Sequence, residues 1–272
     1  MKKHTLNTGT LPTWCPGCFN FQALAGVKMA LKKQLQDKKK KDFAVVTGIG
    51  CHGKMFDYLD LNGLNTLHGR VAPTCLGLKV GNPKLNVIGF SGDGDSYAEG
   101  ISHLIHAARY NSDYKLVVHN NQVFALTVGQ PTPTTELGIK DKTTPFGNKN
   151  PPLNPIKLML SSGASFVARV FADPNQIKRV LTQALEHKGF AFIEILQPCI
   201  IFHNDSGYKD KLYDLQKSRH NKTNWNKAME KAKEFEYGKV YEDTKIPLGI
   251  FYQKKRETLE EKYKQLRKKM RE

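Results

Sequence analysis

The chain alternates between short apolar runs and segments with helical spacing. The apolar runs have the length of buried strands and lie at residues 43–46, 85–90, 116–118, 166–170 and 190–196. One helical face, between the second and third runs, consists of Ile101, Leu104, Ile105 and Ala108. Another, before the first run, consists of Leu24, Val27, Leu31 and Leu35. Helices that alternate with buried strands predict an α/β fold, in which helices cover both faces of a central parallel sheet.

The amino-acid composition changes beyond Cys199. Residues 203–272 are polar and rich in lysine, apart from an apolar stretch at 246–252. We therefore expect two units, a main domain over residues 1–202 and a basic, helical C-terminal extension over residues 203–272. Within the first unit, Asn154-Pro155 and Asp173-Pro174 each place a capping residue before a proline, which predicts two helix starts.

Polar side chains follow two of the predicted strands. Gly92, Asp93, Gly94 and Asp95 come after residues 85–90, and Asn121 follows the next strand. In open α/β sheets, ligands bind at the carboxyl ends of strands. Carboxylate and amide oxygens such as those of Asp93 and Asn121 suit a Mg²⁺ ion that also holds phosphates. Glycines allow close approach of the backbone to a bulky anion, although a purely structural turn and loop would have the same composition.

Composition and charge limit the class of protein. No apolar run approaches the ~20 residues of a membrane span. The first residues contain two lysines but no apolar core, so we expect no signal peptide and a cytoplasmic protein. The net charge of +17 suits an acidic protein partner. Nucleic-acid binding is not expected, because the lysines are scattered without interleaved aromatic residues or zinc-finger spacing.

Five cysteines are present, and disulfides are not expected in the cytoplasm. Cys15 and Cys18 form a C-x-x-C pair before a helix, Cys51 follows a glycine-rich strand end, and Cys199 follows the last strand. Four thiolates at one sheet edge would hold zinc or an iron–sulfur cluster, whereas a C-x-x-C pair by itself also suits dithiol redox chemistry. Spacing does not separate these possibilities. We expect Cys75 to be a small buried side chain.

Seven short motifs occur in a characteristic order. They are Trp14-Cys15-Pro16-Gly17-Cys18, Gly48-Ile49-Gly50-Cys51, Leu67-His68-Gly69-Arg70, Gly92-Asp93-Gly94-Asp95, Asn120-Asn121, Leu126-Thr127-Val128-Gly129-Gln130 and Gln197-Pro198-Cys199. The fourth and fifth resemble the diphosphate-binding motif of thiamine diphosphate enzymes. Together the motifs resemble the β subunit of 2-oxoacid:ferredoxin oxidoreductases, of the pyruvate and 2-oxoglutarate synthase type. The resemblance covers about residues 10–202 and, more loosely, residues 246–251.

The resemblance implies a set of site residues. Mg²⁺ would bind Asp93, Asn121 and the main-chain carbonyl of Val123. A [4Fe–4S] cluster would bind Cys15, Cys18, Cys51 and Cys199, which makes residues 1–202 a thiamine diphosphate- and iron–sulfur-binding domain. Thiamine diphosphate would contact Ile49, Gly50, Cys51, His52, His68, Gly92, Asp93, Gly94, Asp95, Asn121 and Val123.

Two further positions concern the substrate. The resemblance implies that Lys54 lies near the substrate carboxylate and that Leu126 borders the substrate side chain. The chain departs from the family pattern at Gln122, where glycine is frequent, and at Val128, where a basic or polar residue is frequent. Both flank the pocket, so the resemblance does not decide between 2-oxoglutarate and pyruvate.

The implied reaction is oxidative decarboxylation of a 2-oxoacid to acyl-CoA and CO₂, with electrons passed through the cluster to ferredoxin. Thiamine enzymes also need a carboxylate at the aminopyrimidine ring. Glu99 and Glu136 are candidates within this chain, but the resemblance implies a glutamate from an α subunit, and hence a heterodimer whose β chain alone is inactive. Whether γ or δ subunits join stays open. One alternative is a non-redox thiamine decarboxylase or carboligase subunit with structural zinc or no cluster. Another is a basic binding module without a cofactor.

Overall fold

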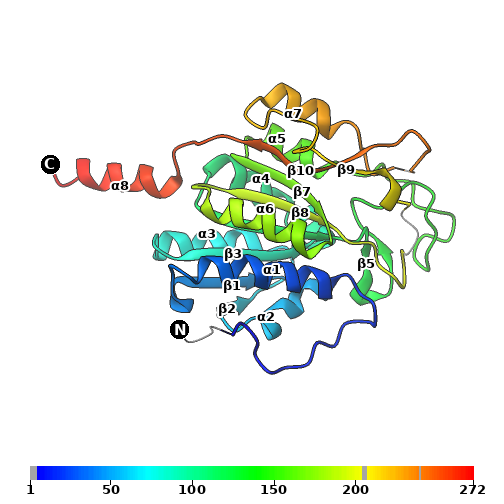
Figure 1. Cartoon of the computed structure of the whole chain (residues 1–272), viewed down its shortest axis with the longest axis horizontal. Coiled ribbons are helices and arrows are strands. Elements are labelled where there is room, and N and C mark those ends of the chain that lie inside the picture. Colours follow the sequence, from blue (N-terminus) through cyan, green and yellow to red (C-terminus); the bar gives the residue numbers. More distant parts are fainter. Residues whose placement is uncertain (1–4, 204–206, 239) are drawn as a thin grey trace.

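The computed structural model describes residues 5–203, 207–238 and 240–272 and is built around an eight-stranded sheet. The strand order is β2-β1-β3-β4-β8-β7-β10-β9 (Figure 1). Its strands are β1 (Phe43–Thr47), β2 (Asn62–Asn65), β3 (Asn86–Gly92), β4 (Tyr114–Asn120), β7 (Phe166–Phe171), β8 (Ala191–Leu196), β9 (Leu212–Asp214) and β10 (Ile246–Gln253). A separate short hairpin joins β5 (Val123–Phe124) to β6 (Gln130–Pro131). Each apolar run in the sequence therefore corresponds to a strand of the sheet.

The sheet is parallel except at one edge. Strands β2, β1, β3, β4, β8 and β7 all run parallel to their neighbours. Strand β10 pairs antiparallel with β7, and β9 pairs parallel with β10. This confirms the predicted α/β fold, in which an antiparallel edge on a parallel sheet is common.

Helices cover both faces of the sheet. They are α1 (Asn20–Gln34), α2 (Met55–Tyr58), α3 (Val71–Gly81), α4 (Ile101–Tyr110), α5 (Pro155–Ser161), α6 (Pro174–Glu186), α7 (Trp225–Ala232) and α8 (Leu259–Lys269). The side chains of Asn154 and Asp173 cap α5 and α6 by accepting hydrogen bonds from the main-chain N–H groups of Lys157 and Gln176. Both predicted helix starts are thereby confirmed.

Each central strand is buried along its whole length because both of its faces are covered. Val45 and Val117 belong to the core under α1 and α6, which pack side by side (Figure 1). Their neighbours Val46 and Val118 belong to the core under α3, α4, α5 and α7. This explains why the strands appear in the sequence as continuous apolar runs rather than as alternating patterns.

The C-terminal extension contributes strands as well as helices. Besides α7 and α8 it supplies β9 and β10, which the expectation of a helical extension did not include. A third apolar cluster packs Leu196, at the end of β8, against Phe235 and Tyr237 of the extension. Residues 1–4, 204–206 and 239 belong to the two predicted units but lie outside the described residues, and the division at residue 202 stays a prediction.

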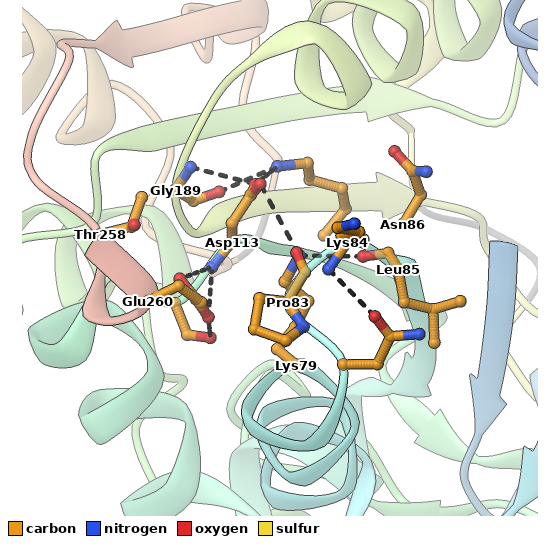
Figure 2. Close-up of polar contacts among 12 residues, drawn as sticks. Lys79, Pro83, Lys84, Leu85, Asn86, Asp113, Gly189, Thr258 and Glu260 are labelled. Atoms are coloured by element: carbon orange, nitrogen blue, oxygen red, sulfur yellow. Dashed lines mark hydrogen bonds and ion pairs between the residues drawn. The ribbon is translucent and has the colours of Figure 1, made fainter. Parts of the chain in front are cut away.

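At the end of the sheet where the parallel strands begin, called the amino edge here, buried lysines bind main-chain carbonyls. Helix α8 also starts at this end (Figure 2). Lys79 Nζ donates to the carbonyls of Pro83 and Leu85, at 2.7 and 2.9 Å. The main-chain N–H of Asp113, just before β4, donates to the Glu260 carboxylate at 3.1 Å. The contact with Glu260 fixes the base of α8, which extends away from the body (Figure 1). In the parts of the chain described, no helix is long and apolar enough to cross a membrane.

Candidate functional site

The carboxyl ends of three neighbouring strands surround one cavity. Strands β1, β3 and β4 are adjacent in the sheet, and the chain leaves them at Gly48, Asp93 and Asn121. The cavity, counted together with the open solvent at its mouth, encloses about 500 Å³. It is lined by all of the proposed thiamine diphosphate contacts, which are Ile49, Gly50, Cys51, His52, His68, Gly92, Asp93, Gly94, Asp95, Asn121 and Val123. Residues predicted from separate motifs therefore meet at one place.

Asp93 is a buried carboxylate at the floor of this cavity. Its Oδ2 accepts hydrogen bonds from Thr132 Oγ1 at 2.6 Å and Thr134 Oγ1 at 3.2 Å. Burial raises the pKa of Asp93 to about 6, although these hydroxyl donors oppose the rise. A buried carboxyl with this pKa is stabilised in its ionised form by a cation, which is the behaviour expected of a metal ligand.

Asn121 is the second candidate oxygen ligand. Its Oδ1 accepts a hydrogen bond from the Val123 main-chain N–H at 3.1 Å, which closes a tight turn after β4. An amide oxygen has a second lone pair, so this turn leaves Oδ1 able to bind a cation. The donor set of Asp93, Asn121 and the Val123 carbonyl thus fits a hard divalent ion in chemistry and in location.

Asp95 has a different role from Asp93, because its contacts are with protein groups. Its Oδ1 accepts from the Gly69 main-chain N–H at 2.5 Å, and its Oδ2 accepts from Ser91 Oγ at 2.6 Å. Burial acts to raise its pKa, but hydrogen bonds and the His52 ring outweigh this effect and lower it. A side chain at Gly48 would place its Cβ 1.9 Å from Asp95 Oδ2, so only glycine fits there. Asp95 therefore holds the strand-end loops in place around the cavity.

Two buried histidines face each other in the cavity, His52 and His119. Their rings are stacked with centroids 6.0 Å apart. His52 Nε2 lies 3.5 Å from Asp95 Oδ2 without hydrogen-bond geometry, and within the described residues neither Nε2 atom has a hydrogen-bond partner. Burial, and then the His52 charge, lower the pKa of His119 to about 3, so this ring is neutral near pH 7. Unpartnered buried nitrogens beside a cavity are suited to a polar ligand.

The sequence analysis did not assign His119 to the site, nor Gln197, whose Oε1 lies 2.8 Å from His119 Nδ1. Phe124, Ala125 and Thr127 also line the cavity without having been assigned. The available signals were that His119 stands next to a motif residue at a strand end and that Gln197 itself belongs to the seventh motif. The ring of Phe124 lies against Gly94, where a Cβ would come within 2.1 Å of Phe124 Cε1.

Four cysteines lie near the same edge of the sheet. The pKa of Cys51 is raised to about 11, first by burial and then by the neighbouring thiols of Cys18, Cys199 and Cys15, in that order. The four are therefore close enough to interact electrostatically, and Cys51 also lines the cavity. However, no group of three or more His, Cys, Asp or Glu side chains in the described ranges is arranged to hold a metal ion. Cys75 is buried in the core, as predicted.

The two predicted substrate residues are placed differently. Leu126 lines the cavity and is exposed at its mouth. Lys54 does not belong to the lining, and its Nζ donates to Thr13 Oγ1 of the N-terminal segment. The contact of Lys54 with a substrate carboxylate stays a prediction.

Gln122 and Val128 both adopt left-handed backbone conformations, with φ of 60° and 72°. This explains why glycine is suited to the first position. Gln122 is held there because its Nε2 donates to the Thr134 carbonyl at 2.7 Å and its Oε1 accepts from Tyr208. Val128 is exposed, and a β-branched residue in this conformation is strained.

Neither glutamate considered for the aminopyrimidine lines the cavity. Glu99 is exposed, and Glu136 is buried in a pair with His203, with Glu136 Oε2 at 2.7 Å from His203 Nε2. Within the described residues, the carboxylates that do line the cavity are Asp93 and Asp95.

Two family models match the chain. The model of the C-terminal TPP-binding domain of thiamine pyrophosphate enzymes matches residues 48–195, which is more than half of the chain. The model described as the C-terminal part of the pyruvate ferredoxin oxidoreductase beta subunit matches residues 204–268. The first range contains every residue that lines the cavity except Gln197.

Individual relatives agree with these matches. A 2-oxoacid:ferredoxin oxidoreductase subunit beta from Saccharolobus solfataricus is 39% identical over 253 residues, 88% of this chain and 81% of the relative. The 2-oxoglutarate synthase subunit KorB of Archaeoglobus fulgidus is 43% identical over 196 residues, 71% of this chain and 72% of the relative. A solved 2-oxoglutarate:ferredoxin oxidoreductase from Magnetococcus marinus superposes with a TM-score of 0.91 at 32% identity, covering 99% of this chain and 91% of that one. The chain therefore belongs to the β subunits of the 2-oxoacid:ferredoxin oxidoreductases, and it is an oxidoreductase subunit with a thiamine pyrophosphate-binding domain.

Proposed function

We propose that this chain binds thiamine diphosphate and Mg²⁺ in the cavity and works as a heterodimer with an α subunit. The complex converts a 2-oxoacid, 2-oxoglutarate or pyruvate, and coenzyme A to acyl-CoA and CO₂, and electrons pass through a [4Fe–4S] cluster to ferredoxin. The observation that carries this proposal is the shared cavity, where Asp93, Asn121 and Cys51 lie together. The cytoplasm is its proposed location, and neither nucleic acid nor a membrane is a proposed partner.

The magnesium site would use Asp93, Asn121 and the carbonyl of Val123. When bound, thiamine diphosphate supplies an electron sink for the loss of CO₂ from a 2-oxoacid. The chain's own contribution is to hold the diphosphate end through the metal and through the open backbone at Gly92 and Gly94. A side chain at Gly92 would approach the His52 ring to 2.9 Å, so glycine keeps this wall of the cavity free.

The histidines are suited to orienting a polar ligand. His119 is neutral near pH 7, and its Nδ1 is fixed by Gln197, which itself donates to Asn20 Oδ1 at 3.0 Å. This chain of contacts holds the His119 ring in one orientation. His119 and His52 both line the cavity, and within the described residues neither Nε2 atom has a hydrogen-bond partner, which suits the two rings to contact with a polar ligand.

The cluster site would use Cys15, Cys18, Cys51 and Cys199. Support comes from the chemistry of four thiols near one sheet edge, the set to which iron–sulfur clusters bind. Cys51 is the residue that belongs both to this set and to the cavity wall. Electrons leaving the cavity would therefore have a short route to the cluster.

The partner subunit would complete the acid–base chemistry. Glu99 and Glu136 lie outside the cavity lining, so neither is placed to act on a ligand there. A carboxylate from an α subunit fits this arrangement, and the exposed side chains of Ile49 and Leu126 at the cavity mouth are suited to burial against another chain. We expect the β chain alone to be inactive.

The test is anaerobic purification of the chain together with its α subunit. We expect Mg²⁺-dependent binding of thiamine diphosphate, visible absorbance from the cluster, and reduction of ferredoxin by a 2-oxoacid plus coenzyme A. 2-Oxoglutarate is the first substrate to assay against pyruvate, because it is named in the Archaeoglobus and Magnetococcus relatives. A colourless zinc protein that decarboxylates without reducing ferredoxin would instead support the non-redox alternative. Decarboxylation by the isolated chain would contradict the need for an α subunit.

The cysteine assignment has its own prediction. Cys51→Ser should abolish the visible absorbance of the purified complex, because it removes a thiolate shared by the cluster and the cavity wall. Cys75→Ala is the matched control, since Cys75 lies on the buried face of α3 and is not among the four proposed ligands, so the absorbance should be unchanged. Absorbance retained in Cys51→Ser would remove Cys51 from the ligand set.

A further inference from the structure

Glu194, in the middle of β8, is a fully buried carboxylate that the proposed mechanism does not use. It accepts hydrogen bonds from four side chains. Arg169 Nε lies 3.0 Å from Oε2, and Asn120 Nδ2 lies 2.8 Å from Oε1. The hydroxyl of Tyr237 donates to Oε2, and that of Tyr97 lies 3.4 Å from Oε1. Glu194 is thus the centre of a buried polar network between strands β4, β7 and β8.

The network includes the C-terminal extension through Tyr237. Arg169 Nη2 donates to the Tyr237 hydroxyl at 2.6 Å, and the guanidinium lies over the rings of Tyr237 and Phe235, at 5.0 and 5.3 Å from their centroids. Tyr237 and Phe235 follow α7, far along the chain from the cavity motifs. The extension therefore supplies one of the four donors that hold the Glu194 carboxylate.

In the other direction the network reaches the proposed metal ligands. Asn120 immediately precedes Asn121, and its amide is oriented from both ends. Its Nδ2 donates to Glu194, while its Oδ1 accepts from the Gln122 main-chain N–H at 3.1 Å and from Thr134 Oγ1 at 2.9 Å. Thr134 Oγ1 also lies 3.2 Å from Asp93 Oδ2. One carboxylate is therefore connected through Asn120 to both sides of the candidate magnesium site.

Stability alone is a weak reason for such an arrangement. A buried ion pair loses the hydration of both charges, and a well-packed apolar replacement is often as stable or more stable. Within the described residues, Arg169 Nη1 has no hydrogen-bond partner, so the pair is not even fully satisfied. What the ion pair does provide is a charged, directional acceptor for Asn120.

We propose that Glu194, held by Arg169 and Tyr237, is a positioning residue that sets the Asn120–Gln122 turn and Thr134 for binding of the magnesium–diphosphate group. The inference rests on the proposed function, since it concerns the same metal site. On this inference, the C-terminal extension affects cofactor affinity from outside the cavity, because its Tyr237 helps to hold the Glu194 carboxylate in place. Groups that orient metal ligands from outside typically change metal affinity by about 10- to 100-fold when they are removed.

The experiment compares two Tyr→Phe variants of the complex purified with its α subunit. Tyr237→Phe keeps the aromatic packing but removes the hydroxyl donor to Glu194. Tyr213→Phe is the matched control, because the Tyr213 hydroxyl also donates to a glutamate of the extension, Glu234, but has no link to Asn120. With thiamine diphosphate at saturation, the dissociation constant for Mg²⁺ is measured by calorimetry, and the melting temperature is recorded for each variant.

We expect Tyr237→Phe to weaken Mg²⁺ binding about 10-fold or more and Tyr213→Phe to change it less than about 2-fold, with the cluster absorbance unchanged in both. A second pair tests the other end of the network: Thr134→Val should weaken Mg²⁺ binding, and Thr134→Ser, which keeps the hydroxyl, should restore it. Equal Mg²⁺ affinity in wild type, Tyr237→Phe and Thr134→Val would overturn the inference. If the wild-type complex itself fails to bind the cofactor with Mg²⁺, the proposed function is wrong instead.

Discussion

At Gly94, the space that a side chain would need is already filled by the ring of Phe124. The ring belongs to the cavity lining and also lies beside His68, with centroids 6.0 Å apart. The structure therefore constrains Gly94 through a neighbour from another segment. The sequence motif predicted a glycine for a different reason, the approach of a phosphate, which stays a proposal.

Gly94→Ala should displace Phe124 and weaken cofactor binding. The new Cβ would lie 2.1 Å from Phe124 Cε1, and overpacking of this kind costs about 1 to 3 kcal/mol in the free energy of unfolding. Gly77→Ala is the control, because a Cβ at that exposed position within α3 meets no atom within 4 Å and should raise the free energy of unfolding by about 0.5 to 1 kcal/mol. Urea denaturation and thiamine diphosphate titration measure both effects. Equal stability of the two variants would contradict the packing account.

Individual residues also show which parts of the site the motifs could predict and which they could not. Asp93 and Asn121 could be assigned as oxygen ligands from their positions after two strands, because strand ends in a parallel sheet share an edge. His119 and Gln197 could not be assigned, because a polar residue at a strand end is equally compatible with a structural contact. Their shared hydrogen bond at 2.8 Å joins residues from two different strands, and no local pattern encodes such a pair.

At the scale of elements, the junction between α6 and β8 is closed by a buried histidine. His187 Nε2 lies 2.8 Å from Ser165 Oγ, and the His187 carbonyl accepts from Lys115 Nζ at 2.6 Å. The pKa of His187 is lowered to about 4, first by burial and then by the charge of Lys115, while Asp113 opposes the shift. The folded protein therefore holds this ring in its neutral form.

This junction predicts a pH dependence of stability. Because the folded pKa of about 4 lies below the ordinary value of 6.5, the folded state binds the proton less readily than the unfolded chain. The neutral His187 ring makes its full contribution to stability above pH 6.5. This contribution is at most about 3 kcal/mol in the free energy of unfolding, and it is lost as the pH falls from 6.5 toward 4. His187→Gln should flatten the dependence of the free energy of unfolding on pH between about 6.5 and 4, as measured by urea denaturation. An unchanged slope in this variant would contradict the assignment.

Element positions were largely predictable, but their pairing was not. The apolar runs gave the strands of the parallel core, and the caps at Asn154 and Asp173 marked two helix starts. The residues of β10 were visible only as an apolar interruption at 246–252. Whether such a strand joins a sheet, and in which direction, depends on contacts with a distant edge, here β7, rather than on local pattern.

At the scale of the whole molecule, the two ends of the sheet have separate tasks. The carboxyl ends of β1, β3 and β4 form the cavity, whereas the opposite end of the sheet binds the base of α8 through the contacts of Glu260 with Ser112 and Asp113 (Figure 2). Changes at the amino edge should therefore alter the attachment of the C-terminal helix without altering the cavity.

Glu260→Ala tests this separation. The change leaves the Asp113 N–H and the Ser112 hydroxyl without their carboxylate acceptor, which should lower the free energy of unfolding by about 1 to 3 kcal/mol and speed proteolysis just before α8. Glu272→Ala is the control, since its pair with Lys268 is exposed and should contribute little. Thermal melting, limited proteolysis and cofactor titration are compared. A loss of cofactor affinity in Glu260→Ala as large as its loss of stability would show that the two ends are coupled.

The sequence by itself determined the α/β class, the positions of the core strands, and the family, because these depend on local periodicity and on short motifs at strand ends. The tertiary structure alone decided which motif residues share the cavity wall, as Cys51 does and Lys54 does not. It also decided that the lysine-rich C-terminal residues complete the sheet and connect, through Tyr237 and Glu194, to the turn beside Asp93. The physical reason is that hydrogen bonds and packing between segments far apart in the chain depend on distances in space, and local sequence does not specify those distances.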